Sequence, residues 1–305
     1  MSRVAIVICW QPGTEDMVKA CLSSIARHTH PDLYEVVLVS AAKTKPSLFF
    51  LNNIQFPLES LQPVNLEPPE GKESSRLHGW MLDEVIPGKL VEENEFLLTL
   101  DSDCFPVADG WIDDLMRMLL DGAILSGILH PWAPPPADLP ASKVEYRVRS
   151  QHCWQSTHVA CQLIRLADYR HLHDKGCRFN SGDDTGLLIP KMVKAGGGKI
   201  DGFKVSRCPV VWESDLNPEF NRYSCLVYGD KVYHHGGFSR SRTSLDDATF
   251  RDSFGWCEDL VLWGRGAEFL LNDRFGYQFK FDREEEVSKE KMQRLFGLKT
   301  HRMPG

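Results

Sequence analysis

The sequence lacks the long apolar runs and the targeting signals that mark membrane and secreted proteins. Over its 305 residues, apolar stretches such as Val4–Trp10 stay far below the roughly 18 residues that a membrane span needs. No basic N-terminal stretch leads into an apolar segment with a small-residue cleavage site. We therefore expect no secretion signal and no membrane span. The chain also contains no internal repeat and no clear linker between domains.

Cysteine pairs with the spacing of metal sites are also missing. The nine cysteines lie at positions 9, 21, 104, 153, 161, 177, 208, 225 and 257, and none of them forms a Cys-x-x-Cys pair. In a chain without a secretion signal, this pattern favours reduced thiols over a structural zinc site. We expect a cytoplasmic protein in which most cysteines fill the core.

The composition excludes several classes of protein. Hydrophobic residues make up 42% of the chain and charged residues 25%, which is close to the average for globular proteins and rules out wholesale disorder, collagen-like repeats and a coiled-coil rod. The net charge of −7 argues against binding of polyanions by bulk attraction, although a local basic groove stays open.

The N-terminal pattern is that of a strand, a helix and a second strand. Residues 4–9 form a short, mostly β-branched run, and residues 35–39 form another. Between them, apolar residues recur at helical spacing: Met17, Val18, Cys21, Leu22 and Ile25. A strand–helix–strand unit of this length predicts a parallel sheet that is covered by helices on both faces.

The remaining pattern extends this α/β reading. We expect further strands at residues 61–66, 95–100, 123–129, 157–165, 204–208, 210–213 and 227–234, and helices at 73–86, 111–120, 167–174 and 183–195. Residues 131–140 hold five prolines and are expected to form a loop. The predicted fold is α/β, with a mixed, mostly parallel sheet in one domain over residues 1–240 and a mainly helical extension over residues 241–305.

Two carboxylates follow an apolar run that is expected to form a buried strand. The run 96–100 leads into Asp101, Ser102 and Asp103. Ligands of open α/β sheets bind at the carboxyl ends of the strands, and the i, i+2 spacing sends both carboxylates to the same side of an extended chain. Two oxygen donors of this kind suit Mg²⁺ or Mn²⁺ bound together with a diphosphate. The alternative is a solvated loop with ordinary capping aspartates.

From these features onward the chain resembles the GT-A glycosyltransferases, and family 2 in particular, over about residues 4–238. The opening strand, the loop at 10–13 and residues 21–39 are similar to the nucleotide-binding half of that family. Residues 71–79 are similar to its Gly-x-x-x-Ala-Arg-Asn-x-Gly segment, with Ser75 and His78 in place of Ala and Asn. Asp101-Ser-Asp103 falls at the place of the Asp-x-Asp metal motif of the family.

The second half of the chain continues the resemblance. Residues 182–188 and 194–196 are similar to the start of the family's Glu-Asp-x-x-Leu helix, although Gly186 replaces a frequent Asp. The resemblance implies that Asp184 is the catalytic base and that Asp183 takes the place of the Glu. A carboxylate at a helix N-terminus is held in its ionised form by backbone N–H groups, as a base requires. A plain pair of capping aspartates is the alternative.

A late histidine is the last element of the resemblance. Many metal-dependent GT-A enzymes supply one as a metal ligand, and Tyr233 here precedes His234, His235 and two glycines. We favour His235 slightly, but strand alternation leaves the choice between the two open. Structural or exposed histidines are the alternative.

The resemblance implies a metal-dependent glycosyltransferase that moves a sugar from a nucleotide-diphosphate sugar, most simply a UDP-sugar, to an acceptor hydroxyl. The implied site residues are Asp101, Asp103, His235 and His234 for Mn²⁺ or Mg²⁺, and Trp10, Gln11, Pro12, Arg76, Asp101 and Ser102 for the nucleotide sugar. The acceptor stays open among glycans, metabolites and, with less support, modified nucleic acid. Inverting and retaining chemistry also both stay open, and a retaining reaction would not use Asp184 as a simple base. A sugar nucleotidyltransferase and a non-catalytic nucleotide- or sugar-binding module are the competing hypotheses.

Overall fold

The structure is a computed structural model that describes residues 3–12, 14–44, 46–49, 51, 54, 56–70, 74–88, 91, 93–132, 154–181, 185–207 and 225–235. The strand expected at 210–213 and the helical extension expected at 241–305 lie outside these residues.

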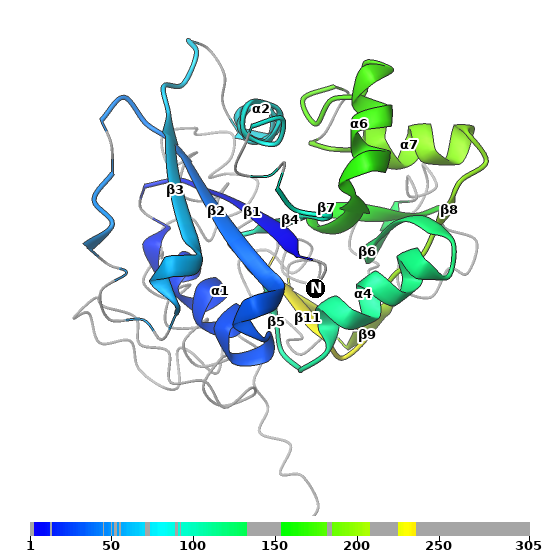
Figure 1. Cartoon of the computed structure of the whole chain (residues 1–305), viewed down its shortest axis with the longest axis horizontal. Coiled ribbons are helices and arrows are strands. Elements are labelled where there is room, and N and C mark those ends of the chain that lie inside the picture. The colour runs from blue at the N-terminus through cyan, green and yellow to red at the C-terminus, as the bar shows by residue number, and fades with distance from the viewer. Residues whose placement is uncertain are drawn as a thin grey trace, which may run out of the picture.

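A seven-stranded mixed sheet forms the centre of the protein (Figure 1). Its strands follow the order β3-β2-β1-β4-β7-β6-β8, and β7 alone runs antiparallel to its neighbours. The strands are β1 (Val4–Trp10), β2 (Tyr34–Ala41), β3 (Leu61–Leu66), β4 (Phe96–Asp101), β6 (Ala123–Trp132), β7 (Trp154–Arg165) and β8 (Lys199–Ile200). This arrangement confirms the predicted α/β class with a mostly parallel sheet.

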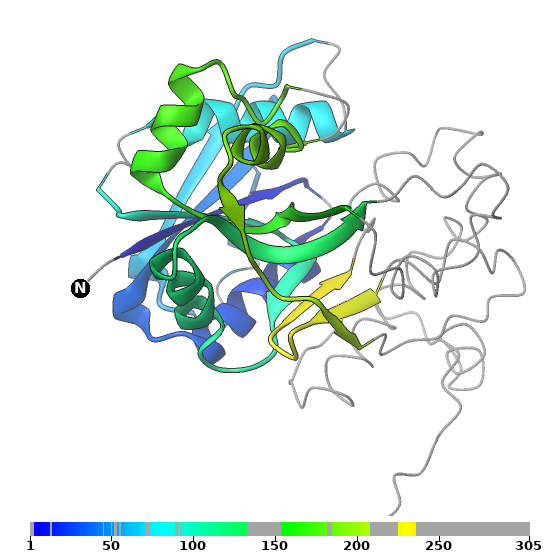
Figure 2. The ribbon, with the colours of Figure 1, turned by 90° about the vertical axis from the view of Figure 1, so that its right-hand side faces the viewer.

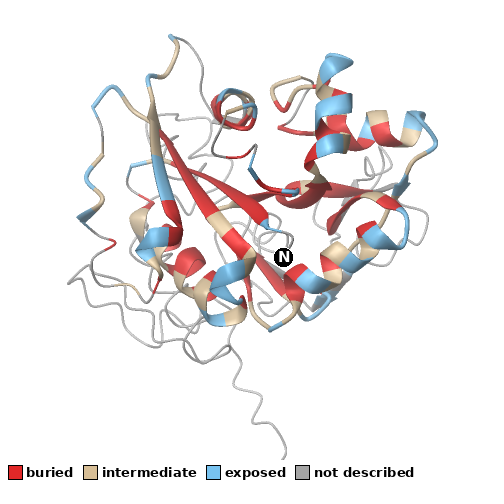
Figure 3. Cartoon of the chain, viewed as in Figure 1, coloured by how far each residue is buried: buried red, intermediate tan, exposed pale blue. Residues whose placement is uncertain are grey.

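Helices cover both faces of the sheet, which explains why its inner strands are apolar along their whole length. Every residue of β1 is buried, as are all residues of β4 except the last (Figure 3). The helices are α1 (Glu15–His28), α2 (Ser74–Val85), α4 (Trp111–Leu120), α6 (Leu166–Asp174) and α7 (Leu188–Ala195). One core cluster joins the sheet to α1 and α4, and a second joins it to α2, α6 and α7. Two layers of core on one sheet are what the strand–helix–strand pattern predicts.

A second, four-stranded sheet lies on the α1 side and was not predicted (Figure 2). Its order is β5-β11-β10-β9, with all pairs antiparallel, and its strands are β5 (Cys104–Pro106), β9 (Val205–Arg207), β10 (Cys225–Tyr228) and β11 (Val232–His235). The single strand expected at 227–234 is therefore wrong. Gly229 and Asp230 have φ of 57° and 55°, and this left-handed pair turns the chain back into a hairpin.

Two further boundaries differ from the sequence prediction. The loop expected from Pro131 onward begins later, because β6 continues to Trp132, which pairs with Trp154. The helix expected from residue 183 begins at Leu188, and the described residues before it, 185–187, form a turn in which Gly186 has φ of 69°. In the described part of the chain, no helix has both the length and the apolar character that crossing a membrane requires.

Helix α2 is tied to the segment that follows α6. The carboxylate of Asp83 accepts hydrogen bonds from the backbone N–H groups of Phe179 (2.7 Å) and Asn180 (2.9 Å). A Cβ at Gly79 would lie 2.9 Å from Cα of Asn180, so the glycine lets the helix approach this backbone closely. Burial raises the pKa of Asp83, although the two backbone donors act in the opposite direction. These contacts fix the position of α2, which carries His78, relative to residues 177–181.

We predict that Asp83→Asn lowers the free energy of unfolding by about 1–3 kcal/mol, because an amide offers one acceptor oxygen and leaves one of the two part-buried N–H groups without a partner. Glu84→Gln, an exposed carboxylate at the next position of the same helix, is the control and should change stability by less than about 0.5 kcal/mol. Urea unfolding followed by circular dichroism measures both changes. Equal stability of the two variants would contradict the assigned role of Asp83.

Candidate metal centre

The candidate site lies where β4 ends. Asp101 is the last residue of this strand and sits beside Cys9 of the parallel strand β1, at the carboxyl ends of both. The next described residues form a turn at 102–103, and the chain then enters the second sheet as β5. The two sheets therefore meet at Asp101, which is the position at which open α/β sheets bind ligands.

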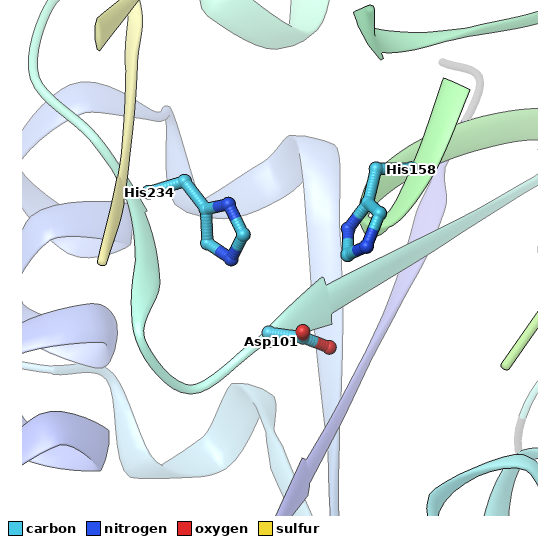
Figure 4. Close-up of side chains that lie close together, drawn as sticks. All are labelled: Asp101, His158 and His234. Carbon is cyan, nitrogen blue, oxygen red and sulfur yellow. The ribbon is translucent and has the colours of Figure 1, made fainter. Parts of the chain in front are cut away.

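Two histidines from distant segments approach Asp101 (Figure 4). His158 comes from β7 and His234 comes from β11. One carboxylate oxygen of Asp101 and one nitrogen of each imidazole all lie within 4.8 Å of one another. Metal–ligand bonds of about 2.1 Å place neighbouring donors about 3 Å apart, so small side-chain rotations would bring the three atoms to a common ion.

The negative charge of the Asp101 carboxylate is poorly balanced by hydrogen bonds, although one of its oxygens is buried. Its Oδ1 atom is buried and has no hydrogen-bond partner among the described residues. Nε2 of His78 on α2 lies 3.5 Å from this oxygen. A buried carboxylate oxygen without hydrogen bonds is costly unless a positive charge lies nearby. A bound divalent cation would supply this positive charge. The nitrogen and oxygen atoms around Asp101 are ligands that such a cation can bind.

Asp103 lies close to the centre but outside the group of three. Its Oδ1 is 3.8 Å from Nε2 of His234, and both side chains are largely buried. The chain is not extended over the whole segment, because it turns at residues 102–103 before it enters β5, but Asp101 and Asp103 both lie near His234. A ligand role for Asp103 stays a prediction.

The structure places His234, and not the favoured His235, in the group of three. Neighbouring residues of a strand point to opposite faces, and His234 lies opposite Cys104, which directly follows Asp103. His235 is the last residue of β11, and its side chain lies outside the described part of the structure.

The residues predicted to contact a nucleotide are spread around this edge of the sheet. Trp10 ends β1 and is buried in the core, whereas Gln11 is half-buried and Pro12 is exposed. Arg76 is exposed in the first turns of α2, and Ser102 is buried in the turn after β4. Gln11, Pro12 and Arg76 therefore stay accessible for the predicted contacts.

The predicted catalytic base lies outside the described residues. Asp183 and Asp184 fall between Ser181 and Thr185, which are described, and their roles stay predictions. The flanking backbone is placed through the hydrogen bonds of Asp83 to residues 179 and 180.

Sequence reasoning missed His158 altogether and noted His78 only as a departure from a motif. Neither residue belongs to a motif with metal-ligand spacing, because His158 is 57 positions and His78 is 23 positions from Asp101 in the chain. The only sequence signal at His158 is its place in a polar stretch, 155–158, at the start of a strand that is otherwise mostly apolar.

Buried thiols surround the base of the site. Cys9, Cys21, Cys104 and Cys161 are free and buried, as expected for reduced core cysteines. Burial raises the pKa of the Cys9 and Cys21 thiols well above the ordinary value. Negative charge at Asp101, and for Cys21 also at Asp103, raises the pKa further. The Cys9 and Cys21 thiols are therefore protonated packing groups rather than nucleophiles at neutral pH.

Comparison with known proteins does not extend these observations. Neither the protein-family models nor the curated proteins searched contain a match to this chain.

We predict that Cys9 and Cys21 resist alkylation by iodoacetamide at pH 8 in the folded protein, because the thiolate is the reactive form and both pKa values are raised. Peptide mass spectrometry after brief labelling measures the modified fraction at each cysteine. The same cysteines should react fully in urea, which provides the control. Rapid labelling of Cys21 in the folded state would show that the thiol is accessible or ionised.

Proposed function

We propose that this protein is a metal-dependent glycosyltransferase of the GT-A type that uses a nucleotide-diphosphate sugar. The observation that carries the proposal is the position of Asp101. The first aspartate of the Asp-x-Asp segment lies at the carboxyl end of a buried central strand, next to a histidine from the Tyr-His-His-Gly-Gly segment. Two segments that the resemblance assigns to one metal site are thus close in space, although they are 133 positions apart.

The sheet supports the same proposal. Its mostly parallel course, with one antiparallel strand next to β4, is compatible with a nucleotide-binding α/β fold in which β1, β2 and α1 belong to the nucleotide half. The accessible residues Gln11, Pro12 and Arg76 lie on the segments that would contact the nucleotide. UDP is the nucleotide that we expect.

Asp101 and His234 would hold Mn²⁺ or Mg²⁺. Such an ion neutralises the charge that develops on the departing diphosphate during sugar transfer. Asp101 fits this task because its buried Oδ1 lacks a hydrogen bond among the described residues, so that its charge is available to a cation. In an inverting reaction Asp184, with Asp183 beside it, would take the proton of the acceptor hydroxyl. A glycan, a metabolite or, with less support, modified nucleic acid would serve as the acceptor.

We predict that Mn²⁺ is required for tight binding of one nucleoside diphosphate. Isothermal titration of UDP, GDP, CDP and dTDP into metal-free protein, with and without Mn²⁺, tests this and identifies the base. Asp101→Asn should weaken the Mn²⁺-dependent binding by about 100-fold or more, because losing a ligand should cost at least as much as losing an outer partner, which typically costs 10–100-fold. Asp113→Asn, an exposed carboxylate on α4, is the matched control and should bind as the wild type does.

The products that the protein releases distinguish a glycosyltransferase from a sugar nucleotidyltransferase and from a binding module. A glycosyltransferase should release the nucleoside diphosphate from its sugar donor slowly in water and faster with an acceptor, in both cases only with metal. A sugar nucleotidyltransferase should instead release pyrophosphate from a nucleoside triphosphate and a sugar 1-phosphate. A binding module should bind the nucleotide without either reaction, and failure to bind any nucleotide would overturn the proposal.

A further inference from the structure

β7 departs from regular pairing where it passes the end of β4. On β6, Gly127 and Leu129 are two residues apart, but their partners on β7, Gln162 and Thr157, are five residues apart. Residues 158–161 of β7 span the place of the single residue Ile128 on β6 and form a bulge that begins at His158. Bulges bend a strand and redirect its side chains, and they are frequent next to active sites.

Buried polar side chains hold this bulge in one shape. Thr99 Oγ1 donates a hydrogen bond to the carbonyl oxygen of Val159 (2.7 Å), and Gln162 Nε2 donates one to Thr157 Oγ1 (2.8 Å). Thr99, Thr157 and Gln162 are at most 3% exposed. Polar groups are costly to bury unless they are paired, so the pairs favour one bulge geometry over alternatives that would leave them unpaired.

The partner strand β6 has a glycine where the bulge of β7 comes close to it. A Cβ at Gly127 of β6 would overlap the carbonyl oxygen of Cys161, so that only glycine fits opposite the bulge. The direction of His158 is therefore set by the backbone of two paired strands, β6 and β7, and not by the side chain of His158 alone.

The two imidazoles face one another across the end of β4. The ring centroids of His158 and His234 are 5.5 Å apart, and the rings are tilted by 38° (Figure 4). Asp101 completes the group from below the two rings in that view, with its ligand oxygen within 4.8 Å of both ligand nitrogens. Three segments that each belong to a different strand thus converge on one point.

We infer that His158 is the third protein ligand of the metal of the proposed function, and that the resulting two-histidine, one-carboxylate centre selects a first-row transition ion such as Mn²⁺, Fe²⁺, Co²⁺ or Zn²⁺ over Mg²⁺. The inference rests on the metal site of that proposal and names the class of metal. Imidazole nitrogen suits transition ions, whereas Mg²⁺ prefers oxygen ligands and keeps several waters. A site with two nitrogen donors and one carboxylate discriminates accordingly.

The same geometry gives Asp103 a positioning role. Its Oδ1 lies 3.8 Å from Nε2 of His234, and it is not among the three mutually close ligands. A carboxylate next to a ligating histidine fixes the orientation of the ring and raises its basicity. This role requires the ion to bind Nδ1 of His234, because Asp103 faces Nε2 of the same ring.

Metal binding should change the hydrogen bonding of His158. Its Nδ1 accepts a hydrogen bond from the backbone N–H of Ala160 (3.1 Å), so a neutral ring in this state carries its proton on Nε2. Ligation through either nitrogen is incompatible with this bond. Through Nδ1 the ion replaces the N–H group, and through Nε2 the proton moves to Nδ1. The amide resonance of Ala160 should therefore shift when the ion binds.

The test uses the full chain freed of metal with a chelator and titrated with Co²⁺, without nucleotide. The absorption bands of Co²⁺ report its ligands and its dissociation constant. We expect His158→Gln to raise the dissociation constant about 100-fold and to change the bands, and Asp103→Asn to raise it about 10–100-fold with the bands at saturation unchanged. His171→Gln, an exposed histidine of α6, is the control and should match the wild type. A 100-fold excess of Mg²⁺ should leave Co²⁺ bound.

Other outcomes of the Co²⁺ titration would contradict the inference or one part of it. Wild-type affinity and bands in His158→Gln would remove His158 from the centre, and displacement of Co²⁺ by Mg²⁺ would overturn the selectivity. Altered bands in Asp103→Asn would make Asp103 a ligand. Co²⁺ binding that depends on His158, combined with no binding of any nucleoside diphosphate, would retain this inference and reject the proposed function.

A measurement on the wild type covers the case in which His158→Gln does not fold. Pulsed electron paramagnetic resonance of the Mn²⁺-loaded protein detects the nitrogen nuclei of coordinated imidazoles. Couplings from two imidazoles support the inference, and coupling from one imidazole alone would overturn it.

Discussion

The carboxylate of Asp101 lies at the end of β4, a buried strand at the centre of the main sheet, and the neighbouring segments are arranged around it. β4 delivers this side chain from an apolar interior, so one of its oxygens is buried without a hydrogen bond among the described residues. Such a group is unfavourable by itself and becomes favourable only when positive charge comes close. His78, His158 and His234 are the groups that approach it, and they come from three elements outside β4.

The antiparallel strand β7 is the main reason why this convergence occurs. In a fully parallel sheet, the neighbour of β4 would present its own carboxyl end at Asp101. β7 instead runs in the opposite direction: its residues 161–165 pair with β4, and its N-terminal half, which carries His158, extends past the end of β4. The second sheet contributes from the other side, because β5 follows Asp101 directly and pairs with the strand that carries His234.

Helix α2 connects the centre to the next part of the site. His78 faces Asp101 from one turn of this helix, and Asp83, one turn further on, holds the backbone at residues 179–180. The close approach at Gly79, between these two residues, makes the connection rigid. A change in one of the two contacts is therefore expected to affect the other, because both depend on the position of the same helix.

The sequence by itself determined the class of the fold and the place of one candidate ligand. Its apolar runs at 4–9, 35–39 and 95–100 required strands buried on both faces, and the helical spacing between the first two required a covered, mostly parallel sheet. Local periodicity carries this information because the burial of each element depends on its own side chains. The position of Asp101 at a strand end was predictable for the same reason.

Only the tertiary structure decided which side chains share the centre. His158 belongs to no motif, and its direction follows from a bulge whose stability depends on Thr99, Gly127 and Gln162 in contact across three strands. The turn at residues 102–103 leads the chain from Asp101 into the second sheet, and the hairpin at Gly229 and Asp230 brings His234 to that sheet. These features arise from pairing between distant segments, and no pattern within one segment encodes them.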